Sequence, residues 1–178
     1  MYRSLLVPLD GFPFAEHALP LALRVARAAG AALRLVRVAD TPAVYYAGAP
    51  YDGELESVVR ARQQAYLDEI VQFLRKLSPV PVSSALLEGP VVGKLCAQAG
   101  DGETDLVVMA THGRGPLGRF WLGSVADELV GRLPVPVLLV RPGDGEVDLA
   151  HEPELGPVLV PLDGSTLAEE ILAPAGEL

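Results

Sequence analysis

Apolar runs of strand length alternate with longer segments whose apolar residues recur at helical spacing. Strands are predicted at 4–9, 32–38, 80–87, 105–110 and 135–140, and helices at 14–29, 54–77, 90–99 and 124–132. This alternation predicts an α/β fold, an open five-stranded parallel sheet with helices on both faces. In such sheets ligands bind outside the carboxyl ends of the strands, where the strand order reverses. The strand ends that could bind a ligand are therefore 8–10, 38–40, 88–90 and 110–113.

Proline and glycine mark boundaries within this pattern. Gly30 is expected to end the first helix, and Pro20 to bend it or loosen one backbone hydrogen bond. Pro134 and Pro136 suggest that the last strand lies at an edge of the sheet. Because an apolar edge strand exposes unpaired backbone groups, we expect a homodimer through the same strand, 135–140, of a second chain.

Composition narrows the class of protein further. The chain has 178 residues, half of them hydrophobic, and contains no uninterrupted run long enough to span a membrane. Its first residues indicate a strand leading into a turn, not a secretory signal. The single cysteine, Cys96, excludes an internal disulfide and is interpreted as a buried structural thiol. We expect a cytoplasmic protein without a membrane partner.

The net charge of −9 is unevenly distributed along the chain. All 14 Lys and Arg lie within residues 1–141, together with an equal number of Asp and Glu, so this part is formally neutral. The remaining acidic residues lie after position 141, where there is no Lys or Arg. The chain has no basic excess that would attract a polyanion, and we expect no nucleic-acid partner.

A repeat near the end of the chain sets the domain organisation. "LVPLDGFPFAEHALPLA" (6–22, the first copy) aligns without gaps on "LVPLDGSTLAEEILAPA" (159–175, the second copy), a shift of 153 residues. We therefore expect one domain at 1–141, an acidic linker at 142–155, and the first strand and partial helix of a truncated second repeat at 156–178. Such a fragment cannot bury its own apolar faces, so it must dock, pair with another chain or be disordered.

The glycine-rich segment 110–124, "ATHGRGPLGRFWLGS", carries the candidate chemistry. Positions 113–118 match GxGxxG, yet they follow the fourth predicted strand, include Pro116, and have no acidic residue placed to bind a ribose. An NAD(P) site is therefore disfavoured. "GPVVGKL" (89–95) lacks the spacing of a Walker A loop and its Ser or Thr.

A phosphate site fits the two ends of this segment better. Gly113 allows backbone amides to approach an anion closely, and Gly123 and Ser124 begin a helix whose first N–H groups have no partner within the helix. Arg114 and Arg119 add positive charge locally, and this segment contains no acid.

The spacing of this segment resembles the universal stress protein family. Nucleotide-binding members of that family carry Gly-x-x-Gly, nine residues, and then Gly-Ser/Thr. Here "ATHG" (110–113), nine residues and "GS" (123–124) reproduce the pattern, with Ala110 in place of the first glycine. The resemblance covers 1–141 and includes "LVPLDG" and "LPVPVLLV"; the second copy resembles the start of the second unit in tandem members.

The resemblance implies an adenine nucleotide alpha hydrolase-like fold and a regulatory ATP-binding module of the stress response, with Mg²⁺ or Mn²⁺ left open. Asp10 and the backbone around Pro8 and Val38 would then hold adenine. A carboxylate at a strand end can accept a hydrogen bond from an exocyclic amino group. The residues implied for ribose and phosphates are Ala110, Thr111, His112, Gly113, Arg114, Gly115, Pro116, Gly123, Ser124 and Val125.

Several alternatives remain open at this stage. One alternative is that Asp10 only caps the turn that follows it, and Ser124 with Asp127 forms a helix-capping pattern that needs no ligand. His112 has no nucleophile or metal-ligand spacing beside it, which favours a role in shaping the loop over one as a general base. For the whole chain, the alternatives are a slow ATPase or phosphotransferase and a nucleotide-independent dimerisation module.

Overall fold

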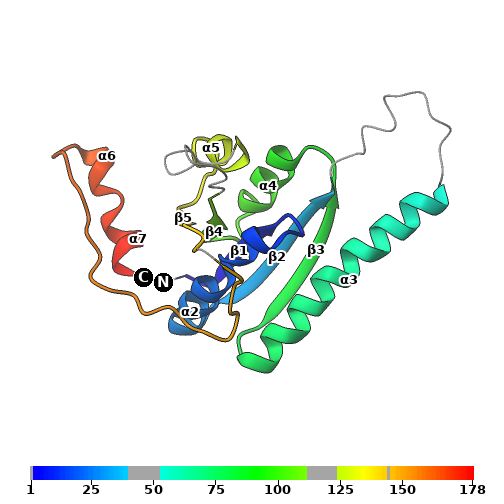
Figure 1. Ribbon diagram of the computed structural model, residues 1–178. Helices are drawn as coiled ribbons and strands as arrows, with labels where there is room; N and C mark the ends of the chain where they lie inside the picture. Colours follow the sequence, from blue (N-terminus) through cyan, green and yellow to red (C-terminus); the bar gives the residue numbers. More distant parts are fainter. Residues whose placement is uncertain (1, 40–52, 112–123, 144) are drawn as a thin grey trace.

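The computed structural model describes residues 2–39, 53–111, 124–143 and 145–178. Its strands are all parallel and form one sheet in the order β3-β2-β1-β4-β5 (Figure 1). The strands are β1 (Ser4–Leu9), β2 (Ala32–Ala39), β3 (Val82–Glu88), β4 (Leu106–Ala110) and β5 (Val137–Val140). The predicted five-stranded parallel sheet is confirmed.

Helices cover both faces of this sheet, as the sequence predicts. On one face lie α1 (Pro13–Glu16), α2 (Leu19–Ala29) and α3 (Gly53–Leu77), and on the other α4 (Val91–Ala99) and α5 (Ser124–Val130). Alternate strand residues enter the two cores, because side chains along a strand point to opposite faces. Leu5 and Val7 pack with α2 and α3, whereas Leu6 packs with α4 and α5.

The helix predicted at 14–29 is two helices, so the prediction of one continuous helix was wrong. A turn at His17 and Ala18, whose N–H groups donate to the carbonyls three residues earlier, separates α1 from α2, and Pro20 lies in the first turn of α2. A proline is well tolerated there because N–H groups of the first turn have no partner within the helix. The predicted end at Gly30 is confirmed, with a left-handed φ of 68°.

The predicted edge position of the last strand is also confirmed. β5 lies at the end of the sheet and pairs only with β4 among the described strands, from Val107↔Val137 to Ala110↔Val140. The Val107 N–H donates to the Pro136 carbonyl at 3.0 Å. Proline has no N–H, but its carbonyl can still extend the ladder at the start of a strand.

The second copy forms its helical part but not its expected strand. Residues 151–163 have no regular secondary structure, and α6 (Thr166–Glu169) and α7 (Leu172–Gly176) follow. Side chains of the body hold this segment: Arg24 donates to the Pro153 carbonyl at 2.6 Å, and the Tyr2 hydroxyl donates to the Pro174 carbonyl at 2.9 Å. Figure 1 accordingly shows α7 ending beside the N-terminus.

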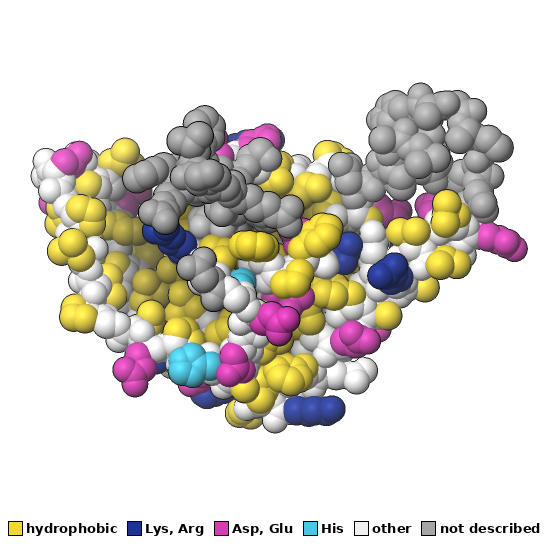
Figure 2. Space-filling model, viewed as in Figure 1, with side chains coloured by type: hydrophobic (Ala, Val, Ile, Leu, Met, Phe, Trp, Pro, Cys, Tyr) yellow, Lys and Arg dark blue, Asp and Glu magenta, His cyan; other side chains and the backbone are white. Residues whose placement is uncertain are grey.

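Apolar side chains of the second copy lie exposed to solvent. Leu159, Leu167 and Leu172 are all exposed, and Figure 2 shows hydrophobic side chains gathered over the hollow between this segment and the body. Of the equivalent residues in the first copy, Leu6 and Leu19 are buried in the two cores and Phe14 is half-buried. The missing strand is explained by the same fact, because residues 157–162 have no neighbouring strand with which to pair.

Candidate functional site

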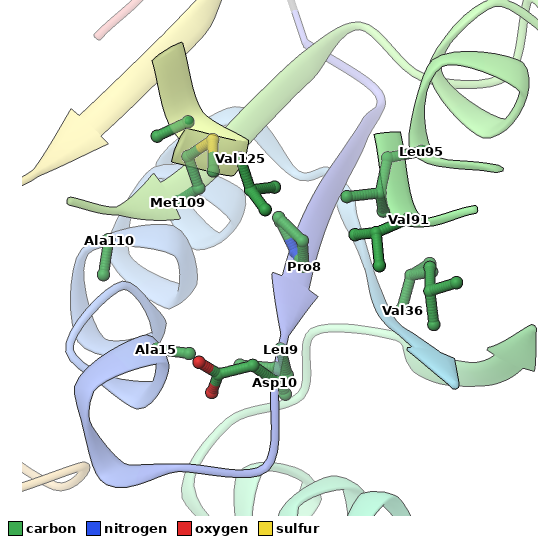
Figure 3. Close-up of a pocket in the computed structure, with 12 residues that line it drawn as sticks. Pro8, Leu9, Asp10, Ala15, Val36, Val91, Leu95, Met109, Ala110 and Val125 are labelled. Atoms are coloured by element: carbon green, nitrogen blue, oxygen red, sulfur yellow. The ribbon is translucent and has the colours of Figure 1, made fainter. Parts of the chain in front are cut away.

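The strand order places a switch point between β1 and β4. From β1 the chain continues to β2 and β3 on one side, then crosses over to β4 and β5 on the other side. At such a point the loops leave the two central strands in opposite directions and open a crevice at the carboxyl ends. A cavity of about 460 Å³ lies there, bordered by the ends of β1 and β4 (Figure 3).

Pro8 explains why β1 and β4 separate at this end. The Ser4 carbonyl accepts from the Asp105 N–H, so the even-numbered residues of β1 direct their backbone groups toward β4. The pairing recorded between the two strands ends at Leu6↔Val107, although both strands continue for three more residues. Pro8 is the next even-numbered residue and has no N–H to donate. On the other side of β1, pairing with β2 continues to Leu9↔Arg37.

Among the described residues, the cavity is walled by apolar side chains from three strands and three helices, with a single carboxylate. Its volume is within the range of roughly 300–1,000 Å³ that is typical of small-molecule sites. Apolar walls suit a flat ring system, and the carboxylate can accept a hydrogen bond from a polar group on it. The lining residues are Pro8, Leu9, Asp10, Ala15, Val36, Val38, Val91, Leu95, Met109, Ala110, Val125 and Ala126.

Asp10 has two roles in this geometry. Its Oδ1 accepts a hydrogen bond from the Phe12 N–H at 2.9 Å, so it does cap the turn. Gly11, inside the turn, has a φ of +83°, a conformation that side-chain-bearing residues rarely adopt. The same carboxylate also lines the cavity, and in Figure 3 it is directed toward Ala15. A carboxylate offers about four acceptor positions, so one turn hydrogen bond is compatible with binding a ligand.

The glycine-serine motif (110–124) begins at this cavity, and the residue that follows the motif also lines the cavity. Ala110, the last residue of β4, and Val125, in the first turn of α5, line it from two sides. Thr111 continues along β5, since its N–H donates to the Val140 carbonyl at 2.9 Å. Ser124 is the first residue of α5. The other predicted site residues, His112, Gly113, Arg114, Gly115, Pro116 and Gly123, lie outside the described residues.

Sequence reasoning missed much of the apolar wall. Val91 and Leu95 lie one turn apart on α4, and Met109 precedes Ala110 on β4; all three line the cavity. Their spacing predicts burial, but it does not distinguish residues that line a cavity from residues that fill the core. The position of α4 over the switch point makes that distinction, and this position follows from the topology and not from a local motif.

The residues that the structure describes contain no group of three or more His, Cys, Asp and Glu side chains placed to hold a metal ion. None of their helices combines the length and apolar character needed to cross a membrane.

Comparison with known proteins places the chain in a family. The family model described as "Universal stress protein family" matches residues 1–141. A universal stress protein from Thermus aquaticus is 35% identical over 147 residues, which cover 79% of this chain and 100% of the relative. Universal stress protein UspA from Lactobacillus plantarum has the same fold, with a TM-score of 0.62 at 24% identity over 79% of this chain and 98% of the other.

A second solved structure is a universal stress protein in complex with cAMP. Its TM-score is 0.58 at 22% identity, over 79% of this chain and 97% of the other. Together with the match of the family model to the whole body of the chain, these similarities identify the family. The chain belongs to the universal stress protein family.

Proposed function

We propose that this chain binds ATP in the cavity between β1 and β4 and acts as a regulatory nucleotide-binding module in stress response. The observation that carries the proposal is an apolar cavity at the switch point that contains the Asp10 carboxylate and is bordered by Ala110 and Val125, on either side of the glycine-rich segment. An adenine ring requires apolar contact on its faces and a hydrogen-bond acceptor for its amino group. The cavity walls and Asp10 supply both.

In this proposal the site residues divide into two groups. Asp10 and the backbone at Pro8 and Val38 bind adenine at the ends of β1 and β2. Residues 110–116 and 123–125 bind ribose and phosphates, with Mg²⁺ or Mn²⁺ as accompanying ions. The cAMP complex of a related protein supports an adenine nucleotide as the ligand class. ATP is favoured over a monophosphate because the motif has the spacing of the ATP-binding members.

The experiment is equilibrium binding of ATP to the purified chain, with AMP and GTP as controls, followed by native mass spectrometry for carried nucleotide. We expect sub-millimolar ATP binding, weaker GTP binding because a guanine ring presents a carbonyl toward Asp10, and a loss of affinity when Gly113 or Gly123 is replaced by a bulky residue. Absence of adenine-nucleotide binding at millimolar concentration would overturn the proposal.

The proposal extends to assembly and organisation. Residues 1–141 form the nucleotide-binding unit, 142–155 are a linker, and 156–178 repeat the first strand and helix of the unit, all in the cytoplasm. The exposed edge of β5 supports a homodimer formed by the same edge of two chains, because every residue of that strand is only half-buried. Native mass spectrometry at micromolar concentration should show two subunits, and an exclusively monomeric protein would contradict this part.

A regulatory role is preferred over catalysis. Phosphoryl transfer needs a positioned base or nucleophile in addition to phosphate binding. Asp10 is the one carboxylate among the described residues that line the cavity, and it lies at the proposed adenine end. Turnover should therefore stay below ~1 s⁻¹, the lower end for kinases. A faster steady-state release of phosphate would favour the ATPase alternative.

A further inference from the structure

Arg37 lies against the turn that carries Asp10. It is paired with Leu9 in the sheet, one residue before Asp10, and its neighbours on β2, Val36 and Val38, line the cavity. Because side chains alternate along a strand, Arg37 points to the opposite face. A Cβ added to Gly11 would lie 2.0 Å from Arg37 Nη1 and 2.5 Å from its Cζ. The guanidinium group therefore packs directly on the backbone of the turn.

Tyr66 on α3 holds Arg37 from the other side. The Arg37 Cζ lies 5.4 Å from the centre of the Tyr66 ring, within the range of a cation–π contact. The Tyr66 hydroxyl donates to Glu16 Oε1 at 2.9 Å, and Glu16 is the last residue of α1, the helix that follows the turn. The contacts thus run from β2 through α3 to α1 and enclose the turn on the side away from the cavity.

The charges around Tyr66 affect its pKa in a way that fits this arrangement. Burial raises the pKa of Tyr66 strongly, and the negative charges of Glu16 and Asp10 raise it further, while Arg37 lowers it. The hydroxyl group is therefore protonated at neutral pH and able to donate to Glu16.

We propose that Arg37, Tyr66 and Glu16 form a positioning network that holds the Asp10 carboxylate in the orientation required to recognise the ligand's amino group. None of the three lines the cavity, so they act through the turn and not on the ligand. The turn needs such support because Gly11 has no side chain that could pack, and glycine has the least restricted backbone of all residue types. The choice of an adenine ligand rests on the proposed function.

The first test compares AMP with inosine monophosphate, which has a carbonyl in place of the 6-amino group. In Arg37→Met and Tyr66→Leu, AMP affinity should fall about tenfold, the size of one weakened hydrogen bond, with inosine monophosphate affinity changed less than about twofold. Tyr66→Phe keeps the ring under Arg37, so its affinity for AMP should lie between those of the wild type and Tyr66→Leu. Arg34→Met, on the same strand at the opposite end of the sheet, is the control and should keep the wild-type ratio.

The second test needs no ligand. The Phe12 amide donates to Asp10, and the Ser165 amide donates to Asp163 in the second copy, at 2.9 and 2.8 Å. NMR hydrogen exchange should show a several-fold faster Phe12 amide in Arg37→Met, with Ser165 unchanged as the internal reference. Unchanged Phe12 exchange together with an unchanged AMP preference would overturn the inference. Faster Phe12 exchange in a protein that binds neither of these monophosphates nor ATP would uphold the network and overturn the nucleotide proposal.

Discussion

The two copies of the repeated sequence form the same turn in different surroundings. Gly11 and Gly164 both have a φ of +83°, and in each copy the aspartate Oδ1 accepts from the N–H two residues later. The helix break is repeated as well: α1 ends at Glu16 and α2 begins at Leu19, while α6 and α7 have the same gap after a shift of 153 residues. Turn and helix break are therefore encoded by interactions within a few residues.

The strand before the turn behaves differently in the two copies. In the first copy it is β1, between β2 and β4, whereas residues 157–162 form no strand. Leu6 is 1% exposed, and its counterpart Leu159 is 90% exposed. Because the residues are nearly the same, the difference shows that a strand depends on its neighbours and not on its own sequence. The first copy alone has β4 and α4 beside it, and therefore a cavity.

The largest difference should appear when the matched leucines are truncated. Leu6→Ala removes a buried side chain from the core under α4 and α5 and should lower the free energy of unfolding by about 2–5 kcal/mol. Leu159→Ala should change it by less than about 0.5 kcal/mol. Urea unfolding followed by circular dichroism measures both. Equal losses would mean that the second copy is buried as the first is.

A smaller effect is expected from Asp105, which anchors the start of β1. The N–H groups of Arg3 and Ser4 donate to its Oδ2 at 2.8 and 3.1 Å; the position equivalent to Ser4 in the second copy is Pro157, which has no N–H. Asp105→Ala should lower the free energy of unfolding by roughly 1.5–3 kcal/mol, because these hydrogen bonds go to a charged group. Urea unfolding at neutral pH gives this difference.

The stabilisation that Asp105 provides should depend on pH. Burial alone would raise the pKa of Asp105, but the hydrogen bonds from Arg3 and Ser4 outweigh it, so the pKa is lowered in the folded state. The stabilisation is therefore complete above the unfolded pKa of about 3.9 and is lost as the pH falls through the lower folded value. An Asp105→Ala difference that stays constant from pH 7 down to pH 2 would exclude this anchor.

The glycines of the two turns provide a third matched pair. Alanine at either position is strained by about 1–2 kcal/mol at positive φ. At Gly11 it also displaces the Arg37 guanidinium, whereas at Gly164 no atom of the described residues lies within 4 Å of the added Cβ. Gly11→Ala should lower both the free energy of unfolding, by about 1–3 kcal/mol, and the affinity for nucleotide. Gly164→Ala should change only the amide signals around its own turn. If Gly164→Ala weakened nucleotide binding as much as Gly11→Ala does, the second copy would have to be part of the site.

The sequence predicts the sheet, its edge strand and most helices, because each follows from a local pattern of apolar residues. It fails at the break between α1 and α2, where helical spacing continues through Pro20, and at the strand of the second copy, whose pattern is nearly that of β1. Among the residues that line the cavity, Pro8, Asp10, Val38, Ala110 and Val125 are predicted from the strand ends and the family resemblance. Arg37 and Tyr66 could not be predicted, because only the folded packing brings β2, α3 and the turn together.

The most direct measurement is ATP binding by isothermal titration calorimetry to the wild-type chain, Asp10→Ala and Asp163→Ala. Both variants remove the aspartate of the same turn, but only Asp10 lines the cavity. The expected result is sub-millimolar binding to the wild type, at least tenfold weaker binding to Asp10→Ala, and unchanged binding to Asp163→Ala, in line with one lost hydrogen bond at the site. Equal affinities of Asp10→Ala and the wild type would contradict the assignment of this cavity as the nucleotide site.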